Sequence, residues 1–126
     1  MALFQTSNNI VEANTITRSA FHGLTVRQSS TGNRFTQNSI VGNSTAGPSL
    51  GINLIPTVVD DGVSPNDVGD GDTGPNNLQN FPVLARASTS GATTTVVGTL
   101  DSAPGTYAVE LFDNAACHVS GHGEGG

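Results

Sequence analysis

Three aspartates lie close together in a stretch of the chain that is rich in turn-forming residues. Asp67, Asp70 and Asp72 alternate with glycines, whose carbonyl oxygens are further hard ligands. Such a loop can fold around calcium more readily than around magnesium, because calcium accepts many irregularly placed oxygen ligands. The stretch is not a complete EF-hand, because counting Asp70 as the first position places Phe81 where the twelfth-position glutamate is required. Calcium binding is one interpretation, and a solvated acidic turn is the other.

A second group of ligand-type residues lies near the end of the chain. Cys117, His118 and His122 form a C-H-x3-H group that could bind zinc or copper, with His22 as a distant fourth ligand. The surrounding sequence is Gly-rich and offers no partners that would orient such ligands. A nucleophile pair of Cys117 and His118 is disfavoured, because adjacent residues of a strand point to opposite faces.

Hydrolysis or lysis of a polysaccharide would require paired carboxylates or a basic residue in a groove. Glu12 and Glu110 are isolated, and the few arginines are expected on solvated surface. We therefore name no catalytic residue and favour a protein without enzymatic activity. The alternative is a carbohydrate-active module, either a glycan binder or a small β-helix polysaccharide hydrolase or lyase. Glycan binding by Asn- and Thr-bearing surfaces stays open, although there is no Trp to stack on a sugar. Asn43 begins an Asn-Ser-Thr sequon and is a candidate glycosylation site.

The elements that would position these residues are indicated by a pattern that occurs twice. Residues 9–16 (NIVEANTI) match residues 33–40 (NRFTQNSI) after 24 residues, and residues 23–26 (GLTV) match residues 51–54 (GINL) after 28. The loop at 44–48 can absorb the four-residue difference. Short apolar alternations at such a period, punctuated by Asn and Gly, are typical of the rungs of a β-solenoid.

Stacking of the two copies would place each residue of one copy over a residue of similar type in the other. Val11 and Ile16 are five residues apart, so both point inward only if the chain turns a corner at Asn14 or at its counterpart Asn38. Asparagine tolerates the left-handed conformation of such corners, and stacked amides can form hydrogen bonds along the axis. The alternative is an ordinary antiparallel sandwich in an Asn-rich chain. The expected stacked pairs are Asn9 with Asn33 and Asn14 with Asn38.

Composition limits the class of protein and its partners. Among 126 residues there are 16 Gly and 6 Pro, which disfavours long helices, and only 5% are aromatic, so a thin aliphatic core is expected. The formal net charge of −6 argues against binding to nucleic acid or to anionic membranes. There is no apolar run of about 18 residues to insert into a membrane and no signal peptide at the start of this chain. The single cysteine excludes an internal disulfide.

The chain divides into three zones, and the expected fold class is all-β. Residues 1–54 hold the short parallel β-helix rungs, and residues 55–80 form an acidic loop rich in Gly, Pro, Asp and Asn. Residues 81–126 are expected to form an incomplete antiparallel β-sandwich meander that ends in a loose Gly-rich tail. The strands expected in this meander are 81–87, 93–100 and 107–112.

Several stretches carry a resemblance to a known group of proteins: 51–54 (GINL), 61–67 (DGVSPND), 69–84 (GDGDTGPNNLQNFPVL) and 98–102 (GTLDS). They resemble the C-terminal part of bacterial cell-surface proteins that carry right-handed parallel β-helix repeats followed by immunoglobulin-like β-sandwich domains. The resemblance extends from residue 33 to the end of the chain. It implies an extracellular or cell-surface location and a role in adhesion or surface structure, with no catalytic residues to transfer.

The number of strands predicts self-association. A sandwich needs about seven strands and a solenoid about three rungs, whereas the sequence indicates three strands and two rungs. We therefore expect either a fragment of a longer protein or a subunit that completes its fold by pairing with copies of itself. Unpaired strands at 93–100 or 107–112 would then join neighbouring chains into a homo-oligomer or filament.

Overall fold

The computed structural model describes residues 1–44, 49–60 and 62–126. Within these residues the chain forms nine β-strands and one short 3-10 helix, so the predicted all-β class is confirmed. Apart from Ser44, the loop expected to absorb the four-residue insertion lies outside the described residues, as do Thr45 of the sequon and Asp61 of the acidic zone.

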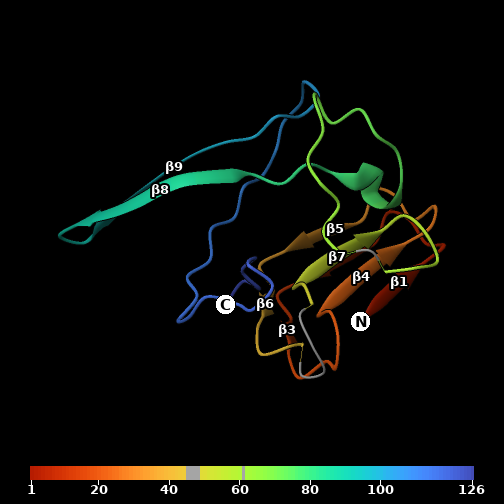
Figure 1. Ribbon diagram of the computed structural model, residues 1–126, viewed down its shortest axis with the longest axis horizontal. Helices are drawn as coiled ribbons and strands as arrows, with labels where there is room; N and C mark the ends of the chain where they lie inside the picture. Colours follow the sequence, from red (N-terminus) through yellow and green to blue (C-terminus); the bar gives the residue numbers. More distant parts are fainter. Residues whose placement is uncertain (45–48, 61) are drawn as a thin grey trace.

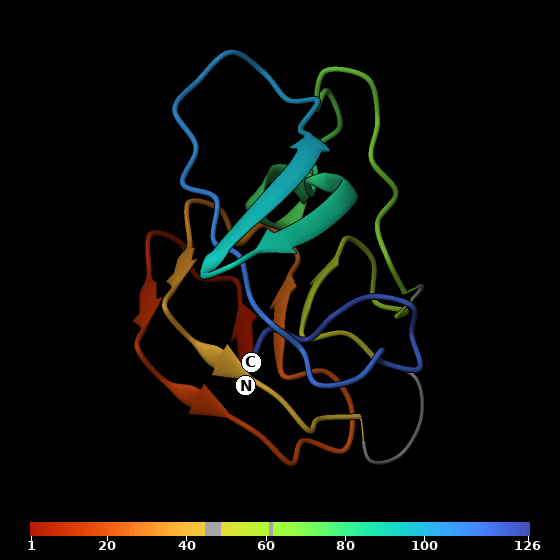
Figure 2. The ribbon, with the colours of Figure 1, turned by 90° about the vertical axis from the view of Figure 1, so that its left-hand side faces the viewer.

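Seven short strands in the first 55 residues pair in parallel. One sheet contains β1 (Ala2–Phe4), β4 (Leu24–Arg27) and β7 (Ile52–Ile55). The other pairs are β2 (Ile10–Glu12) with β5 (Arg34–Thr36) and β3 (Thr15–Ile16) with β6 (Ser39–Ile40). We name β2, β3 and β4 the first layer and β5, β6 and β7 the second layer. Figure 2 shows this part of the chain, red to olive, winding around a common centre.

The register between the layers follows the sequence alignment of the two copies. Val11 pairs with Phe35, and Leu24 pairs with Ile52. Apolar side chains therefore stack on apolar side chains, as alternation in each strand predicts. The predicted alignment of residues 9–26 with residues 33–54 is confirmed at every paired position.

Left-handed residues turn the corners of both layers. Ala13 and Gln37 (φ 55° in each) occupy one corner, and Arg18 (φ 62°) and Gly42 (φ 63°) occupy the next. The first corner thus lies one residue before the asparagine at which it was predicted. The asparagine instead directs its side chain across the layers, where it forms the hydrogen bonds described below.

The apolar core is thin and is built from side chains of β1 to β5 and β7. Its buried residues and the partly buried side chains packed on them are Val11, Leu24, Val26, Leu3, Ile16, Phe35 and Leu54. Ile52, in the second layer, is 40% exposed. The interior is therefore open on the side of the second layer that faces away from the first.

The outward face of β7 is covered, although its alternation predicts a solvated face. Asn53 is 1% exposed and Ile55 is fully buried. Asp60 accepts a hydrogen bond from the Asn53 side chain, and the Ser64 hydroxyl donates one to the Leu54 carbonyl. The segment that follows β7 therefore folds back over this sheet.

After Ile55, the last residue of β7, the described residues of the acidic zone contain the 3-10 helix η1 (Pro75–Leu78) and no strand. Asn76, Asn77 and Leu78 have left-handed backbone conformations (φ 46°, 56° and 52°). These conformations give η1 its kink and turn the Asn76 side chain toward the second layer, where it bonds to Asn33.

A β-hairpin follows the acidic zone and projects from the rest of the molecule (Figure 1). It consists of β8 (Val83–Ser90) and β9 (Thr93–Thr99), joined by a two-residue loop. Gly91, the first loop residue, has φ 61°, as a type II′ turn requires. Because the turn begins there rather than at Ser88, β8 extends further along the chain than the predicted strand 81–87.

The predicted third strand at 107–112 is wrong. Residues 100–126, all of which the structure describes, form no helix or strand. This segment returns to the second layer, where Glu110 accepts hydrogen bonds from Thr36 and Gln37. The antiparallel part of the fold is therefore a two-stranded hairpin and not a three-stranded meander.

Candidate metal site and neighbouring polar clusters

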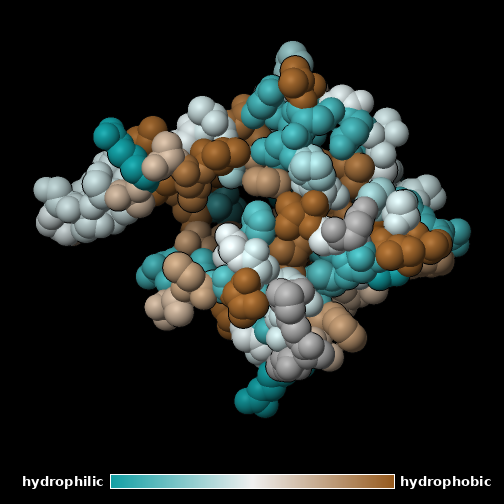
Figure 3. Space-filling view, in the orientation of Figure 1, coloured by the Kyte–Doolittle hydropathy of each residue, from teal (hydrophilic) through white to brown (hydrophobic). Residues whose placement is uncertain are grey.

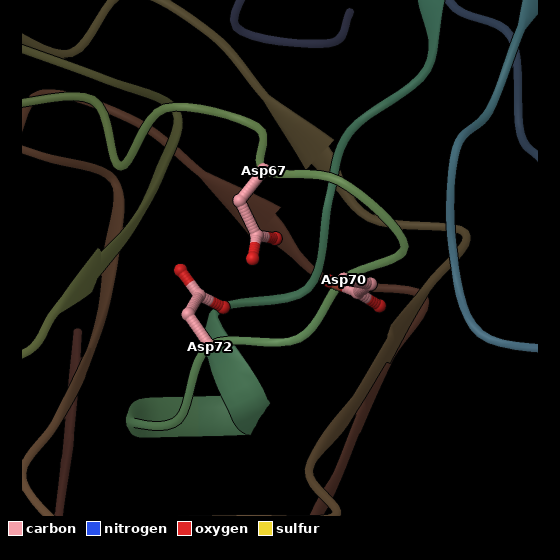
Figure 4. A group of neighbouring side chains, drawn as sticks. All are labelled: Asp67, Asp70 and Asp72. Carbon is pink, nitrogen blue, oxygen red and sulfur yellow. The ribbon is translucent and has the colours of Figure 1, made fainter.

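The three aspartates of the acidic zone converge in space. A tight turn with left-handed residues at Gly69 (φ 70°) and Asp70 (φ 58°) reverses the chain between Asp67 and Asp72. One carboxylate oxygen from each of the three aspartates lies within 4.8 Å of the other two. In Figure 4 the carboxylates of Asp67 and Asp72 face each other, with Asp70 beside them. Three hard oxygen donors at this spacing could hold a metal ion.

Asn80 fastens this turn to the rest of the fold. Its side chain is 3% exposed; its Oδ1 accepts from the Asp67 N–H (3.0 Å), and its Nδ2 donates to the Asp67 carbonyl (2.8 Å). The same Nδ2 donates to the Asp101 carbonyl (2.7 Å), just after β9. Asn80 therefore joins the acidic turn to the exit of the hairpin.

The three carboxylates differ in how many hydrogen bonds they accept. Asp70 accepts hydrogen bonds from the Gln79 side chain (2.8 Å), the Asn80 N–H (2.8 Å) and the Ser102 hydroxyl (2.6 Å). Asp67 accepts from the Gly71 N–H (3.1 Å). Among the described residues, Asp72 Oδ1 has no partner although the atom is shielded from solvent.

The environment of Asp72 disfavours its charged form. Burial raises the pKa of Asp72 above its ordinary value, and the negative charges of Asp67 and Asp70 raise it further. A bound cation would reverse both effects by supplying an opposite charge and a ligand for the unpartnered oxygen. The cluster could therefore hold a metal ion.

The candidate zinc or copper ligands Cys117, His118 and His122 do not assemble. In the part of the chain that the structure describes, the aspartate cluster is the only group of three or more such side chains with ligand atoms close enough to share an ion. His118 instead bonds through Nδ1 to the Ser120 hydroxyl (2.8 Å), and Cys117 is exposed. His22, the expected distant ligand, lies elsewhere and is occupied by other partners.

His22 belongs to a polar cluster on the covered face of β7. Its Nδ1 accepts a hydrogen bond from the Leu50 N–H (2.9 Å), so Nε2 carries the proton of the neutral ring and donates it to Asp60. Asp60 Oδ1 also accepts from the Asn53 side chain (3.0 Å). Both ring nitrogens are thus engaged, which leaves His22 no free nitrogen for a metal ion or for proton transfer.

Asp60 is held in its charged form by these partners. Burial alone would raise its pKa, but the hydrogen bonds from His22, the Gly62 amide and Asn53 lower the pKa below its ordinary value. The cluster holds the segment after β7 against the sheet, which is a structural role.

A ladder of asparagines connects the two layers. In each of Asn33, Asn38 and Asn43, Oδ1 accepts the N–H of the residue 24 positions earlier, and Nδ2 donates to the carbonyl 27 positions earlier. The predicted pairs of Asn9 with Asn33 and Asn14 with Asn38 are confirmed. The third step, from Asn43 to Ser19, was missed, although the five-residue spacing of the three asparagines signals it.

Asn43 is the candidate glycosylation site, and its amide is already engaged. The residue is 6% exposed, and its Nδ2 donates to the Ile16 carbonyl (3.0 Å). Attachment of a glycan to this nitrogen would require the ladder to open at that step. The third residue of the sequon lies outside the described residues, so glycosylation stays an untested prediction.

Three side chains from the C-terminal part of the chain bond to the open side of the second layer. Asn76 Oδ1 accepts from the Asn33 N–H (3.0 Å), and Glu110 accepts from the Gln37 N–H (2.9 Å) and the Thr36 hydroxyl. Glu124 accepts from the N–H groups of Gly42 (2.8 Å) and Asn43 (3.0 Å). Sequence reasoning missed all three contacts.

A cavity of about 650 Å³ remains between this segment and the second layer. Phe35, Ile40 and Ile52 line it from the second layer, and Tyr107 and Phe112 line it from the returning segment. Asparagine and glutamate side chains complete its wall. The apolar interior is therefore bridged by the returning segment but not packed against it.

No family model matches this chain, and neither a curated protein nor a solved structure is similar to it. Among the described residues, no helix is long and apolar enough to cross a membrane.

Proposed function

We propose that this chain is a non-enzymatic structural module that associates with copies of itself. In this proposal the two layers are successive rungs of a short parallel β-helix. The parallel pairing with matched registers and the asparagine ladder support that assignment, because repeats that stack like on like bury a continuous core. A location outside the cell or at a cell surface is also proposed, on the sequence resemblance alone.

The projecting hairpin is the observation that carries self-association. All residues of β8 are exposed, and each strand of the hairpin has the other as its only partner strand within the described residues. Val83, Leu84 and Val97 are 53%, 58% and 39% exposed. Figure 3 shows apolar surface gathered where the hairpin joins the body. An extended edge with apolar side chains favours pairing with a strand of another copy.

The register of the hairpin identifies which backbone groups are free to pair. In a two-residue hairpin the closing pair, here Ser90 and Thr93, exchanges hydrogen bonds, and the pairs then alternate. Val97 therefore donates to the partner strand within the hairpin, whereas Val96 directs its N–H to the outer edge of β9. Addition of a strand at this edge would use the Val96 N–H.

The proposal is tested by placing proline at these two positions. Val96→Pro removes an outward donor and should leave a monomer at concentrations where the unmodified chain assembles. Val97→Pro removes a donor within the hairpin and should disrupt the hairpin itself. Sedimentation velocity measures association, and negative-stain microscopy shows whether filaments form. A sharply monomeric unmodified chain at high concentration would contradict the proposal.

Calcium is the ion we propose for the aspartate cluster. Support comes from the donor set, which consists of carboxylates on an irregular loop, and from the shielded, unpartnered oxygen of Asp72. The cluster precedes η1, and Asn80 joins its turn to the exit of the hairpin. Calcium would therefore stiffen the connection between the layers and the projecting strands.

Glycan binding is a second candidate function, and the 650 Å³ cavity is the observation that favours it. Tyr107 could contact a sugar ring, and Asn77 and Gln79 could form hydrogen bonds with hydroxyl groups. A glycan array separates the two candidates. Binding that is lost in Tyr107→Ala would support the second candidate, and no binding to any glycan would remove it.

A further inference from the structure

Side chains from η1 and from the returning C-terminal segment imitate the contacts of a further layer. Within the ladder, the Asn9 N–H donates to Asn33 Oδ1 (3.0 Å); one layer on, the Asn33 N–H donates to Asn76 Oδ1 (3.0 Å). In the same way, the Ser19 N–H donates to Asn43 Oδ1 (3.1 Å), and the Asn43 N–H donates to Glu124 (3.0 Å). Side chains from distant parts of the sequence thus accept hydrogen bonds from the N–H groups at the open edge of the second layer.

Two of these acceptors are carboxylates placed at the corners. The left-handed residues Gln37 and Gly42 turn their N–H groups outward, and neighbouring N–H groups in such turns form a concave anion site. Glu110 binds at the first corner and Glu124 at the second. The third acceptor, Asn76, is a neutral amide.

Few contacts other than these hydrogen bonds hold the segment in place; one of them is the His122 ring, which packs edge-on against Phe81 with the ring centroids 5.9 Å apart. Residues 100–126, all within the described part of the chain, form no helix or strand. The 650 Å³ cavity separates the segment from Phe35, Ile40 and Ile52. The hydrogen bond from the Ile40 N–H to the Gly125 carbonyl (2.7 Å) is the further contact at this edge.

We propose that residues 106–125 form an acid-releasable cap on the second layer, held by the carboxylates of Glu110 and Glu124. At neutral pH both carboxylates accept hydrogen bonds from backbone N–H groups. Protonation removes the charge that strengthens these bonds, so the segment detaches and uncovers the cavity and the open edge.

The surroundings of Glu110 fit this behaviour. The Thr36 hydroxyl, the Gln37 amide and the charge of Arg34 lower the pKa of Glu110 below its ordinary value. A lowered pKa in the folded state means that the contribution of Glu110 is complete above the ordinary pKa of about 4.3 and is lost as the pH falls through the lowered value. Within the described residues no arginine lies within ion-pair distance of a carboxylate, so neither glutamate is held by a cation.

Amide hydrogen exchange on the full chain tests the cap. Protection factors are measured by NMR at about pH 6.5 and about pH 3, each corrected for the intrinsic exchange rate at that pH. The amides of Gln37, Gly42 and Asn43 should lose about tenfold or more of their protection in acid. The amides of Arg34 and Ser39, which bond within the two layers, should keep theirs.

An internal control and a matched variant separate release from unfolding. The Asn33 amide bonds to the neutral Asn76 and should not respond to acid. The double variant Glu110→Gln and Glu124→Gln should show the low protection at pH about 6.5, whereas Glu12→Gln, at an exposed position of β2, should not. The proposal would be overturned if the amides of Gln37, Gly42 and Asn43 kept their protection in acid. It would also be overturned if their protection fell only together with that of Arg34 and Ser39.

Discussion

The side chain of Asn38 joins two layers that lie 24 residues apart in the sequence. Its Oδ1 accepts from the N–H of Asn14 (3.0 Å), while its Nδ2 donates to the carbonyls of Val11 (2.8 Å) and Thr36 (3.0 Å). The residue is 5% exposed. One buried amide thus satisfies backbone groups of both layers, which short strands of two or three residues could not do by pairing alone.

Replacing Asn38 tests how much the ladder stabilises the fold. Asn38→Ala leaves buried backbone groups without partners and should lower the free energy of unfolding by about 2–4 kcal/mol. Asn14→Ala removes the corresponding side chain of the first layer, which is exposed, and should cost about 1 kcal/mol or less. Urea denaturation of both variants measures the difference. Equal losses would show that the ladder is not the main polar support of the layers.

The pairing of the layers could be predicted because stacked copies repeat their chemistry. Asn14 with Asn38 and Leu24 with Ile52 are matched in type and in order, so the alignment of the copies also gives the register. The strand predicted at 107–112 had the same apolar alternation but no copy to align with. Alternation shows that a segment can form a strand, but it does not identify a partner strand.

The residues of the candidate site could likewise be predicted from the sequence only in part. Asp67, Asp70 and Asp72 could be found from the sequence because a short turn is enough to bring them together. Asn80 and Ser102 support that turn from positions further along the chain, and isolated polar residues have no period that would indicate such contacts. The cluster of His22 and Asp60, 38 residues apart, was missed for this reason.

The cluster of His22 and Asp60 should make stability depend on pH. The pKa of Asp60 is lowered in the folded protein, so its stabilising contribution is complete above its ordinary value of about 3.9 and is lost as the pH falls through the lowered pKa. Asp60→Asn should therefore reduce the loss of unfolding free energy between about pH 5 and about pH 2. Urea denaturation across this pH range measures the change in the free energy of unfolding.

The matched control for that experiment is Asp113→Asn, because Asp113 is an exposed aspartate in the segment without regular structure. Its pH dependence should stay close to that of the unmodified chain. If Asp60→Asn and Asp113→Asn gave the same pH dependence, the hydrogen bonds from His22 and Asn53 would not be coupled to folding.

Calcium should stabilise the fold by relieving repulsion in the aspartate cluster. The pKa of Asp72 is raised, so ionisation of Asp72 costs stability as the pH rises through that value, and the cost is present at neutral pH. Calcium at tenfold its dissociation constant, which is about 0.1–1 mM for weak irregular sites, should raise Tm by about 5 °C. Differential scanning calorimetry with calcium and with a chelator measures this shift.

The informative variant is Asp72→Asn, because Asp70 also holds Gln79 and Ser102 and its removal would disturb the turn itself. Asp72→Asn removes one of three negative charges, so Tm without calcium should rise while the response to calcium falls. Asp113→Asn should change neither quantity, and magnesium should stabilise less than calcium because it demands regular octahedral geometry. Identical melting curves with calcium and with chelator would leave the cluster as a hydrogen-bonded acidic turn that binds no ion.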